Sequence, residues 1–288
     1  MEEIQRRLIS GNKARPETEN KAKALILGTF EPNDIEVYMT ERRMPYIPEL
    51  AKRIEEEWKS KATQGQFAGP LTRVEFFGLT PEGKLALTLG KTDFKEYCGS
   101  RSLQSLREYG YKGISNPLSV SVTLMTSDDK MLIAQKVQSE PIGSIDAIGG
   151  YVHPEEDFDS RRGVISIFQA AYREVWEEAQ IKTEEISESW CLGLLYEYAG
   201  LCHPVASFAF RTQLTSEEIR KRKADEIEVL VVSPQRSPNS NGGEYVMQLL
   251  YERHPHVEPD GRVTIALARK LFAGKYYQKQ VIVTADGI

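Results

Sequence analysis

The spacing of apolar residues in the first part of the chain predicts a small α+β unit. Over residues 48–61, apolar side chains recur at a four-residue step, which predicts a helix with one buried face. Residues 72–79 and 84–90 are rich in apolar side chains and flank a short turn containing Pro and Gly, so we expect two paired strands. A second short helix is expected at residues 102–109.

From Pro117 onward the apolar pattern is that of strands interrupted by helices. We predict strands at residues 118–126, 130–137, 145–152, 190–198, 205–214 and 227–233, helices at 164–179, 216–223, 243–253 and 262–273, and a final apolar segment at 279–285. A mixed sheet with a helix on each face assembles these elements most simply. The predicted fold class is therefore α/β (α+β). A small N-terminal α+β domain is expected at residues 1–115, and a larger α/β/α sandwich domain at residues 116–288.

Composition narrows the class of protein without indicating an activity. Of the 288 residues, 40% are hydrophobic and 27% are charged, a balance that supports a buried core. The formal net charge of -5 gives little attraction for a phosphate backbone, so nucleic acid is not expected as a partner. Three cysteines without CxxC spacing argue against disulfides and structural zinc, and suit a reducing compartment. Because there is no signal-peptide pattern and no apolar window of about 18 residues, we expect a cytoplasmic protein without a membrane span.

A group of carboxylates on the long predicted helix is the strongest indication of chemistry. Glu174 and Glu178 are four residues apart, so they lie on one helical face with Glu177 beside them. Like charges at this spacing repel each other, and a shared divalent cation removes the repulsion. Hard carboxylate oxygens suit Mg²⁺ or Mn²⁺, which fill the rest of their shell with water and substrate phosphates.

These carboxylates also have a simpler explanation. Acidic residues at helical spacing usually form a solvated face, and Lys182 follows Glu178 by four residues as an ion-pair partner. The context favours chemistry, because a strand that ends in Gly149-Gly150 and then a loop precede the helix.

This arrangement resembles the Nudix box, whose pattern is G, five residues, E, seven residues, then R-E-U-x-E-E-x-G-U, with U aliphatic. Gly150 is followed after five residues by Glu156, residues 173–178 match R-E-U-x-E-E at every position, and Ile181 fills the last U. The chain is therefore identified as a member of the Nudix superfamily.

Two positions depart from the box. Sixteen residues, not seven, separate Glu156 from Arg173, which is an insertion of nine residues in the loop. Gln180 replaces the Gly that normally ends the helix in a left-handed conformation. The insertion leaves the role of Glu156 open, and Gln180 puts the end of the helix in question but not its metal-binding face.

The resemblance extends to the animal Nudix-type UDP-sugar pyrophosphatases over roughly residues 50–235. It rests on the segment LGKTDFKEYCGS at residues 89–100, on the expanded box, and on FRTQLTSEEIRKR at residues 210–222. This family implies an N-terminal domain and hydrolysis of UDP-glucose or UDP-galactose to UMP and the sugar 1-phosphate. We predict that the N-terminal domain packs on the larger one and that residues 89–100 line part of the substrate pocket. An equal alternative is that residues 89–100 only cap the sheet of the N-terminal domain.

The resemblance also implies roles for individual residues. Glu174 and Glu178 would be the primary ligands of Mg²⁺ or Mn²⁺, and the carbonyl of Gly150 would complete the shell. Glu177 would be a further ligand or the base that orients the attacking water. Arg173 would brace the glutamates through its i,i+4 pairing with Glu177.

Several other polar residues have a structural explanation beside a functional one. Cys202-His203 is expected in a turn, because no paired base can be identified, and the Pro between His254 and His256 argues against a metal pair. Exposed charges at strand edges are more frequent than catalytic ones. Candidates for an additional acid are Glu226, Glu228 and Glu197, and candidates to contact substrate phosphates are Arg211 and Lys136, with Arg173 and Glu156 nearer the box.

Three classes of function remain open at this point. The first is an enzyme acting on a small nucleotide, with a UDP-sugar favoured and ADP-ribose or another nucleoside diphosphate derivative as the alternative. The second is a nucleotide-binding Nudix module without turnover, and the third is a purely structural protein, which would leave three clustered carboxylates unused. A homodimer is compatible with the sequence, which does not determine the oligomeric state.

Overall fold

The computed structural model describes residues 22–63, 65–136, 145–198, 202–222, 227–232, 259–272, 278–283 and 288. The predicted helix at residues 243–253 lies outside the described residues. None of the helices in these ranges is long and apolar enough to cross a membrane.

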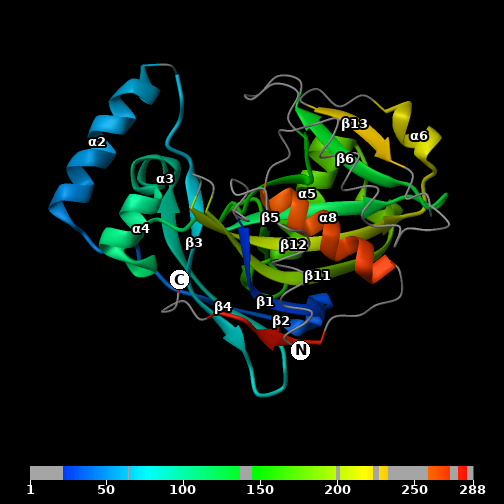
Figure 1. The fold of residues 1–288 in the computed structure, drawn as a ribbon, viewed down its shortest axis with the longest axis horizontal. Coiled ribbons are helices and arrows are strands. Elements are labelled where there is room, and N and C mark those ends of the chain that lie inside the picture. The colour runs from blue at the N-terminus through cyan, green and yellow to red at the C-terminus, as the bar shows by residue number, and fades with distance from the viewer. Residues whose placement is uncertain are drawn as a thin grey trace, which may run out of the picture.

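A large mixed sheet forms the centre of the molecule (Figure 1). Its strands follow the order β13-β6-β5-β12-β11-β1-β14, with β7 paired to β6 and β8 paired to β5. The β5–β12 pair is parallel, and the other pairs in this sheet are antiparallel. The strands are β1 Ala22–Phe30, β5 Ser119–Met125, β6 Met131–Lys136, β7 Ile145–Asp146, β8 Ile148–Tyr151, β11 Ile186–Glu197, β12 His203–Thr212, β13 Ile227–Val232 and β14 Gln280–Val281.

Helices cover both faces of this sheet, as the sequence predicts. Helix α5 (Ile167–Ala179) packs against β8, β5 and β13, and α8 (Pro259–Phe272) packs against β5, β11 and β12. Residues of β5 such as Val120 and Val122 belong to the core beneath α5, whereas Val205 and Ala209 of β12 belong to a second cluster beneath α8. The two clusters make an α/β/α sandwich, which confirms the predicted fold class.

A smaller α+β unit lies beside the sandwich (Figure 1). Its sheet has the order β2-β4-β3, with β2 parallel and β3 antiparallel to β4. The unit contains β2 Ile35–Met39, β3 Pro70–Leu79, β4 Leu85–Asp93, α2 Pro48–Ala62, α3 Phe94–Ser100 and α4 Leu103–Tyr109. The remaining short elements are α6 Ser216–Arg220, the 3-10 turns Pro32–Asp34, Tyr111–Gly113 and Thr183–Glu185, and a hairpin of β9 Phe158–Asp159 with β10 Val164–Ile165.

The small unit and the sandwich are joined through backbone and core. Thr72 of β3 donates its N–H to the Val152 carbonyl at 3.2 Å and accepts from the Leu118 N–H at 2.8 Å. One apolar cluster includes Val74 and Phe77 of the small unit together with Val120 of the large sheet. A shared core of this kind holds the two parts in a fixed arrangement.

The domain boundary near residue 115 stays a prediction, with one finding that bears on it. Strand β1 precedes the boundary, yet it pairs with β11 in the large sheet rather than with the small one. Leu25, Ile26 and Phe30 of β1 are fully buried in the common core. The first described strand therefore belongs structurally to the sandwich, because its apolar residues are buried only there.

The observed elements differ from the sequence-based ones mainly where the apolar pattern is short. The strand predicted at residues 145–152 is divided into β7 and β8, and the helix predicted from residue 164 begins at Ile167, because residues 164–165 form β10. Strands β1 and β2, helix α3 and the β9–β10 hairpin are not among the predicted elements.

Candidate active site

Helix α5 presents an apolar face to the core, with Glu174 at the edge of that face and Glu177 exposed. Ser166 caps its N-terminus by accepting a hydrogen bond from the Gln169 N–H, and Ala171 and Val175 are completely buried. Because positions four apart share a face, this apolar stripe fixes the rotation of the helix about its axis. Glu174 is carried to the edge of the buried face, where it is only 6% exposed.

The helix ends in a left-handed conformation even though its terminal residue is not glycine. Gln180 has φ 55° and ψ 35°, and its N–H donates to the Trp176 carbonyl at 2.9 Å. The side chain donates to the same carbonyl at 3.1 Å, and Arg222 Nη1 donates to the Gln180 carbonyl at 2.6 Å. The helix therefore ends in the left-handed conformation that the Gly of the Nudix box normally adopts. Because Gln180 has a side chain, this conformation is strained.

Replacing Gln180 with Gly should stabilise the protein. Glycine removes the steric cost of the left-handed conformation, about 1–2 kcal/mol, while the backbone bonds to Trp176 and Arg222 are kept. After subtraction of the two weak side-chain bonds, we expect Tm to rise by about 2 °C in differential scanning calorimetry. Gln180→Ala is the matched control, since it loses the same bonds but keeps the strain, and it should melt below the wild type. A Gly variant that melts no higher than the Ala variant would disprove the strain.

Gly150 and Glu174 are in direct contact across β8 and α5. A Cβ built on Gly150 would lie 2.3 Å from Glu174 Oε1, so no side chain fits there while the carboxylate keeps its position. Burial raises the pKa of Glu174 to about 7, against the opposing charge of Arg173. The close approach leaves the backbone of β8 directly beside a desolvated carboxylate.

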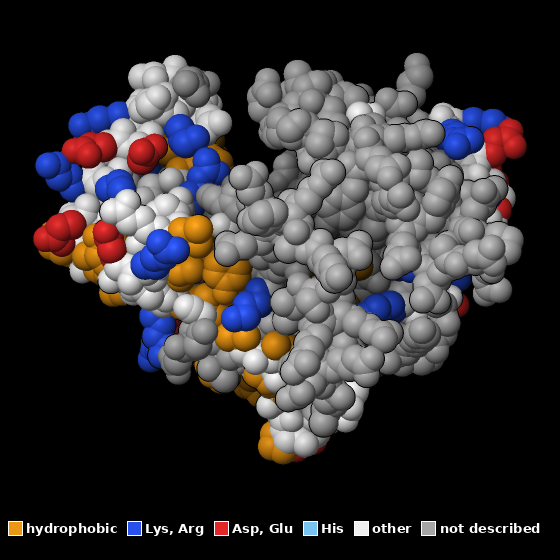
Figure 2. Space-filling view, viewed as in Figure 1, with side chains coloured by type: hydrophobic (Ala, Val, Ile, Leu, Met, Phe, Trp, Pro, Cys, Tyr) orange, Lys and Arg blue, Asp and Glu red, His pale blue; other side chains and the backbone are white. Residues whose placement is uncertain are grey.

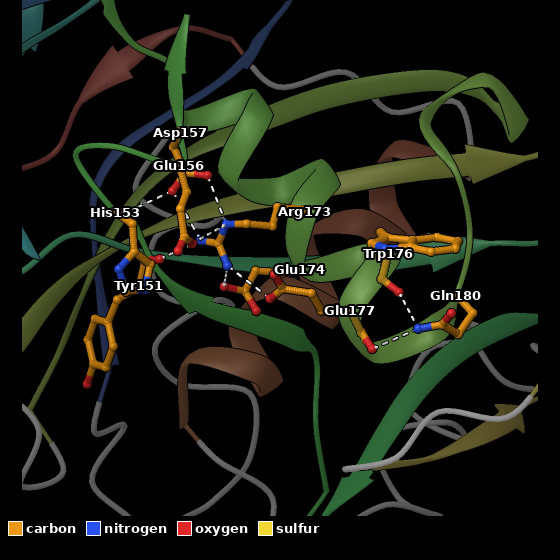
Figure 3. A network of polar contacts seen from close by, with 9 residues as sticks. All are labelled: Tyr151, His153, Glu156, Asp157, Arg173, Glu174, Trp176, Glu177 and Gln180. Carbon is orange, nitrogen blue, oxygen red and sulfur yellow. Dashed lines mark hydrogen bonds and ion pairs between the residues drawn. The ribbon is translucent and has the colours of Figure 1, made fainter. Parts of the chain in front are cut away.

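Arg173 links the glutamates to the loop that precedes the helix (Figure 3). Its Nη1 donates to Glu174 Oε1 at 2.7 Å and to Glu177 Oε2 at 3.0 Å. Its Nη2 donates to the Tyr151 carbonyl at 2.8 Å, and Nε with Nη2 forms a fork on Asp157 at 2.9 and 3.1 Å. Burial works against the charged guanidinium, but the bonds to Asp157 and the surrounding carboxylates raise the pKa of Arg173 above its usual value.

The buried acid of the loop is Asp157, which the sequence analysis did not single out. Its side chain is fully buried, and its Oδ2 also accepts the His153 N–H at 2.7 Å. Glu156, which occupies the acid position of the box, is 61% exposed and lies 3.7 Å from Arg173 Nε. Burial and the hydrogen bonds from Arg173 and His153 distinguish Asp157 from Glu156. Neither feature can be recognised from a sequence in which an Asp directly follows the expected Glu.

The nine-residue insertion closes on itself as the β9–β10 hairpin. The Ser166 N–H donates to the Asp157 carbonyl at 2.8 Å, so the chain returns to its starting point immediately before α5. Arg162 at the hairpin donates from Nη2 to the Ile35 carbonyl of β2 at 2.9 Å. The insertion therefore leaves the loop and helix of the box in contact and also attaches them to the small unit.

The donor set on α5 and β8 fits a hard divalent cation. Glu174, Glu177 and Glu178 supply carboxylate oxygens from one helical turn, and the missing side chain of Gly150 leaves room for backbone oxygen to approach. Within the described ranges, no three His, Cys, Asp or Glu side chains stand ready as a metal-binding group. Arg173 binds one oxygen of Glu174 and one oxygen of Glu177. The Glu177 side chain is half exposed, so it has room to turn toward a cation.

The other candidate residues named from the sequence fall into two groups, those whose side chains the structure describes and those whose side chains it does not. Arg211 lies at the end of β12, where Nη1 pairs with Asp129 at 3.0 Å and the guanidinium stacks over Phe272. Glu197 and His203 are opposite one another in the β11–β12 ladder, and both are buried. Lys136 and Glu228 lie in the paired strands β6 and β13, but their side chains are not described. Glu226, His254 and His256 lie outside the described residues.

Cys202-His203 marks the start of β12 rather than a nucleophile. Cys202 has φ 46° and is buried, as are the other free cysteines, Cys98 and Cys191. His203 Nε2 is 3.0 Å from Ser119 Oγ, and its ring packs against Tyr97 and Tyr151. Both residues act in packing at the junction of the two parts of the molecule.

Part of the segment 89–100 packs toward the sandwich. Tyr97 is 1% exposed and packs edge-on against Tyr151, the residue that follows Gly150. Thr92 Oγ1 donates to Glu96 and is hydrogen-bonded to Ser115. The predicted packing of the N-terminal segment on the larger part is thus observed in these contacts, while its lining of a substrate pocket stays a prediction.

Comparison with known proteins gives two related sequences in mammals. The chain is 25% identical over 217 residues to the mouse uridine diphosphate glucose pyrophosphatase NUDT22, covering 62% of this chain and 70% of the mouse protein. It is 26% identical over 191 residues to the human protein of the same name, covering 57% of this chain and 63% of the human one. The match therefore spans less than two thirds of the human protein. No protein-family model matches the chain.

Solved structures of Nudix proteins resemble parts of the chain. A NUDIX hydrolase from Nitrosomonas europaea is 22% identical, with a TM-score of 0.37, and covers 56% of this chain and 90% of that one. The NUDIX domain of Shewanella oneidensis NrtR, solved with ADP ribose, is 15% identical, with a TM-score of 0.34, and covers 54% of this chain and 87% of that one. The chain is therefore similar to Nudix hydrolases, both in the box residues on α5 and β8 and in its match to the uridine diphosphate glucose pyrophosphatase NUDT22 of mouse and human.

Proposed function

We propose that this protein is a Mg²⁺-dependent hydrolase that cleaves the diphosphate of a UDP-hexose, giving UMP and hexose 1-phosphate. The observation that carries the reaction type is the contact between Glu174 and Gly150, with Glu177 and Glu178 on the same helix. Carboxylate oxygens from one turn of α5, with the backbone of Gly150 beside Glu174, would supply ligands for a cation that also binds diphosphate oxygens. The choice of a uridine substrate is supported by the relatives at 25% and 26% identity.

In this mechanism Glu174, Glu178 and the carbonyl of Gly150 would hold the cation. When bound, Mg²⁺ neutralises the diphosphate oxygens and lowers the pKa of a bound water. Glu177 is the residue we propose as base, because it is half exposed and reaches solvent where the other glutamates are more buried. It takes a proton from water as the water oxygen bonds to one phosphorus, and the bridging P–O bond breaks with its electron pair on the departing phosphate.

Arg173 and Asp157 serve this chemistry as positioning residues. Arg173 fixes one oxygen of Glu174 and one of Glu177, so that the remaining oxygens point away from the guanidinium. Asp157 in turn fixes the guanidinium from the buried side with two hydrogen bonds. Preorganisation of this kind keeps the ligand oxygens in place before the cation and substrate arrive.

A panel of nucleotide substrates tests the proposal. With Mg²⁺ present, we expect UDP-glucose and UDP-galactose to turn over faster than ADP-ribose, with UMP and hexose 1-phosphate as products separated by chromatography. Faster hydrolysis of ADP-ribose would reassign the substrate. The appearance of UDP and free sugar would mean cleavage at the sugar carbon and a different mechanism. Binding of a nucleotide without turnover of any substrate would indicate a binding module.

A further inference from the structure

A cavity lies in the small unit, between α2 and α3. It has a volume of about 260 Å³ and is lined by side chains of α2, α3 and the residues that follow α3. Its floor is formed where α3 packs directly on α2, since a Cβ on Gly99 would lie 2.3 Å from the Ile54 Cα. The lining residues are Arg53, Glu57, Lys61, Cys98, Gly99, Arg101 and Ser102.

The lining of this cavity is predominantly cationic. Arg53, Glu57 and Lys61 follow one another at four-residue steps, so they lie on one face of α2, and Arg101 stands opposite on the other wall. Three cations against one carboxylate leave a net charge of +2. In the described part of the chain, none of these four side chains is within 4.0 Å of an oppositely charged group. Figure 2 shows Lys and Arg side chains interspersed with Asp and Glu over the surface of the small unit.

Both arginines are held in place by packing. Arg53 Nη2 donates to Ser105 Oγ at 2.9 Å and its guanidinium lies over the Tyr109 ring, while Arg101 lies over the Tyr97 ring. Arg53 Nε is buried, and it has no hydrogen-bond partner among the residues that the structure describes. The charged guanidinium groups that line the cavity are suited to an anion, because hydrogen bonds to phosphate oxygens from arginine are strong.

We propose that this cavity binds the phosphate group of a small phosphorylated metabolite as a dianion. The dianion balances the net charge of +2, and arginine forks suit phosphate oxygens. A volume just below the usual range for small-molecule sites limits the ligand to a phosphate and a small attached group. None of the carboxylates of α5 lines the cavity, so this site is distinct from the proposed catalytic one and does not depend on the proposed substrate.

The position of α3 gives the site a route to the box. One side of α3 contributes Cys98 and Gly99 to the cavity, and its other side places Tyr97 against Tyr151. The carbonyl of Tyr151 accepts the bond from Arg173. Phosphate binding would therefore affect the position of α3, which contacts β8 beside the glutamates of α5.

Cys98 provides a local measure of occupancy. It lines the cavity and is 6% exposed, whereas Cys191 and Cys202 are 0% and 1% exposed. Burial raises the pKa of the Cys98 thiol, and the nearby Arg101 and Lys61 oppose that rise. A bound phosphate would block access and also neutralise those cations, so both effects slow alkylation of Cys98.

The experiment measures the rate of Cys98 alkylation by iodoacetamide, with mass spectrometry to locate the label, on the full chain without divalent cations. Inorganic phosphate, glucose 1-phosphate and UMP are the probes, and isothermal titration calorimetry gives their affinities. We expect millimolar or lower concentrations of at least one probe to slow labelling by at least about tenfold. The probe that binds most tightly identifies whether free phosphate, a sugar phosphate or a nucleotide is the natural ligand.

Matched variants separate a built site from general surface charge. Lys61→Gln should weaken probe binding about tenfold, because it removes one charged hydrogen-bond donor from the cavity. Lys52→Gln removes the same charge from an exposed position of the same helix, outside the cavity, and should leave binding unchanged. Unchanged Cys98 labelling with every probe, or equal losses in the two variants, would overturn the proposal.

Discussion

Glu178→Gln should lower the turnover of the proposed substrate by at least about 10²-fold and leave the fold intact. Glutamine keeps the shape and helix propensity of glutamate, so the packing of α5 should barely change. The substitution removes one negative charge from the cation's ligands, which weakens metal binding and misplaces the attacking water together. Glu174→Gln should have a similar effect on turnover, since the buried Glu174 carboxylate lies against Gly150.

Activity and melting temperature should be measured with and without Mg²⁺ for both variants. Without the metal, each should be as stable as the wild type or slightly more stable, because a repulsion between carboxylates is relieved. Glu217→Gln, on helix α6 and 79% exposed, is the matched control and should leave turnover unchanged. Full activity of Glu178→Gln, with a melting temperature indifferent to Mg²⁺, would show that these carboxylates are a solvated face.

Asp157→Asn should be the most destabilising conservative change at the site. In the wild type, the Asp157 carboxylate accepts two hydrogen bonds from the buried guanidinium of Arg173. In the variant, the guanidinium faces a neutral amide instead. Removal of one partner of a buried ion pair costs about 3–5 kcal/mol, and the retained bonds to Glu174 and Glu177 place the expected loss near about 3 kcal/mol. Turnover should fall as well, because Arg173 no longer holds the glutamates.

Glu156→Gln is the control for this prediction. It makes the same change of charge one residue away, at a side chain that is 61% exposed and 3.7 Å from Arg173 Nε. Its effect on the free energy of unfolding should stay within about 0.5 kcal/mol, as for exposed ion pairs. Chemical denaturation of both variants decides between the two acids. A larger loss for Glu156→Gln than for Asp157→Asn would return the role of the loop acid to Glu156.

The sequence alone determined the elements whose pattern is local and long. The helix that carries Arg173, Glu174, Glu177 and Glu178 was predicted because an apolar stripe at four-residue spacing and the box residues occur together within a few turns. Most strands of the sandwich, though not β1, were predicted for a similar reason, since their apolar runs are continuous and bounded by turns. The resemblance of this one segment to the Nudix box also indicated the superfamily.

The tertiary structure decided the features that depend on burial and on distant partners. Both Asp157 and Glu156 lie within 4.0 Å of Arg173, but only Asp157 is buried there and accepts two of its hydrogen bonds, whereas two adjacent acids look equivalent in a sequence. Gln180 can end α5 in a left-handed conformation because Arg222, 42 residues later, donates to its carbonyl. Strand β1 joins the large sheet because its pairing partner, β11, lies far along the chain. In each instance the stabilising contact is distant in sequence, which is why a local pattern does not predict it.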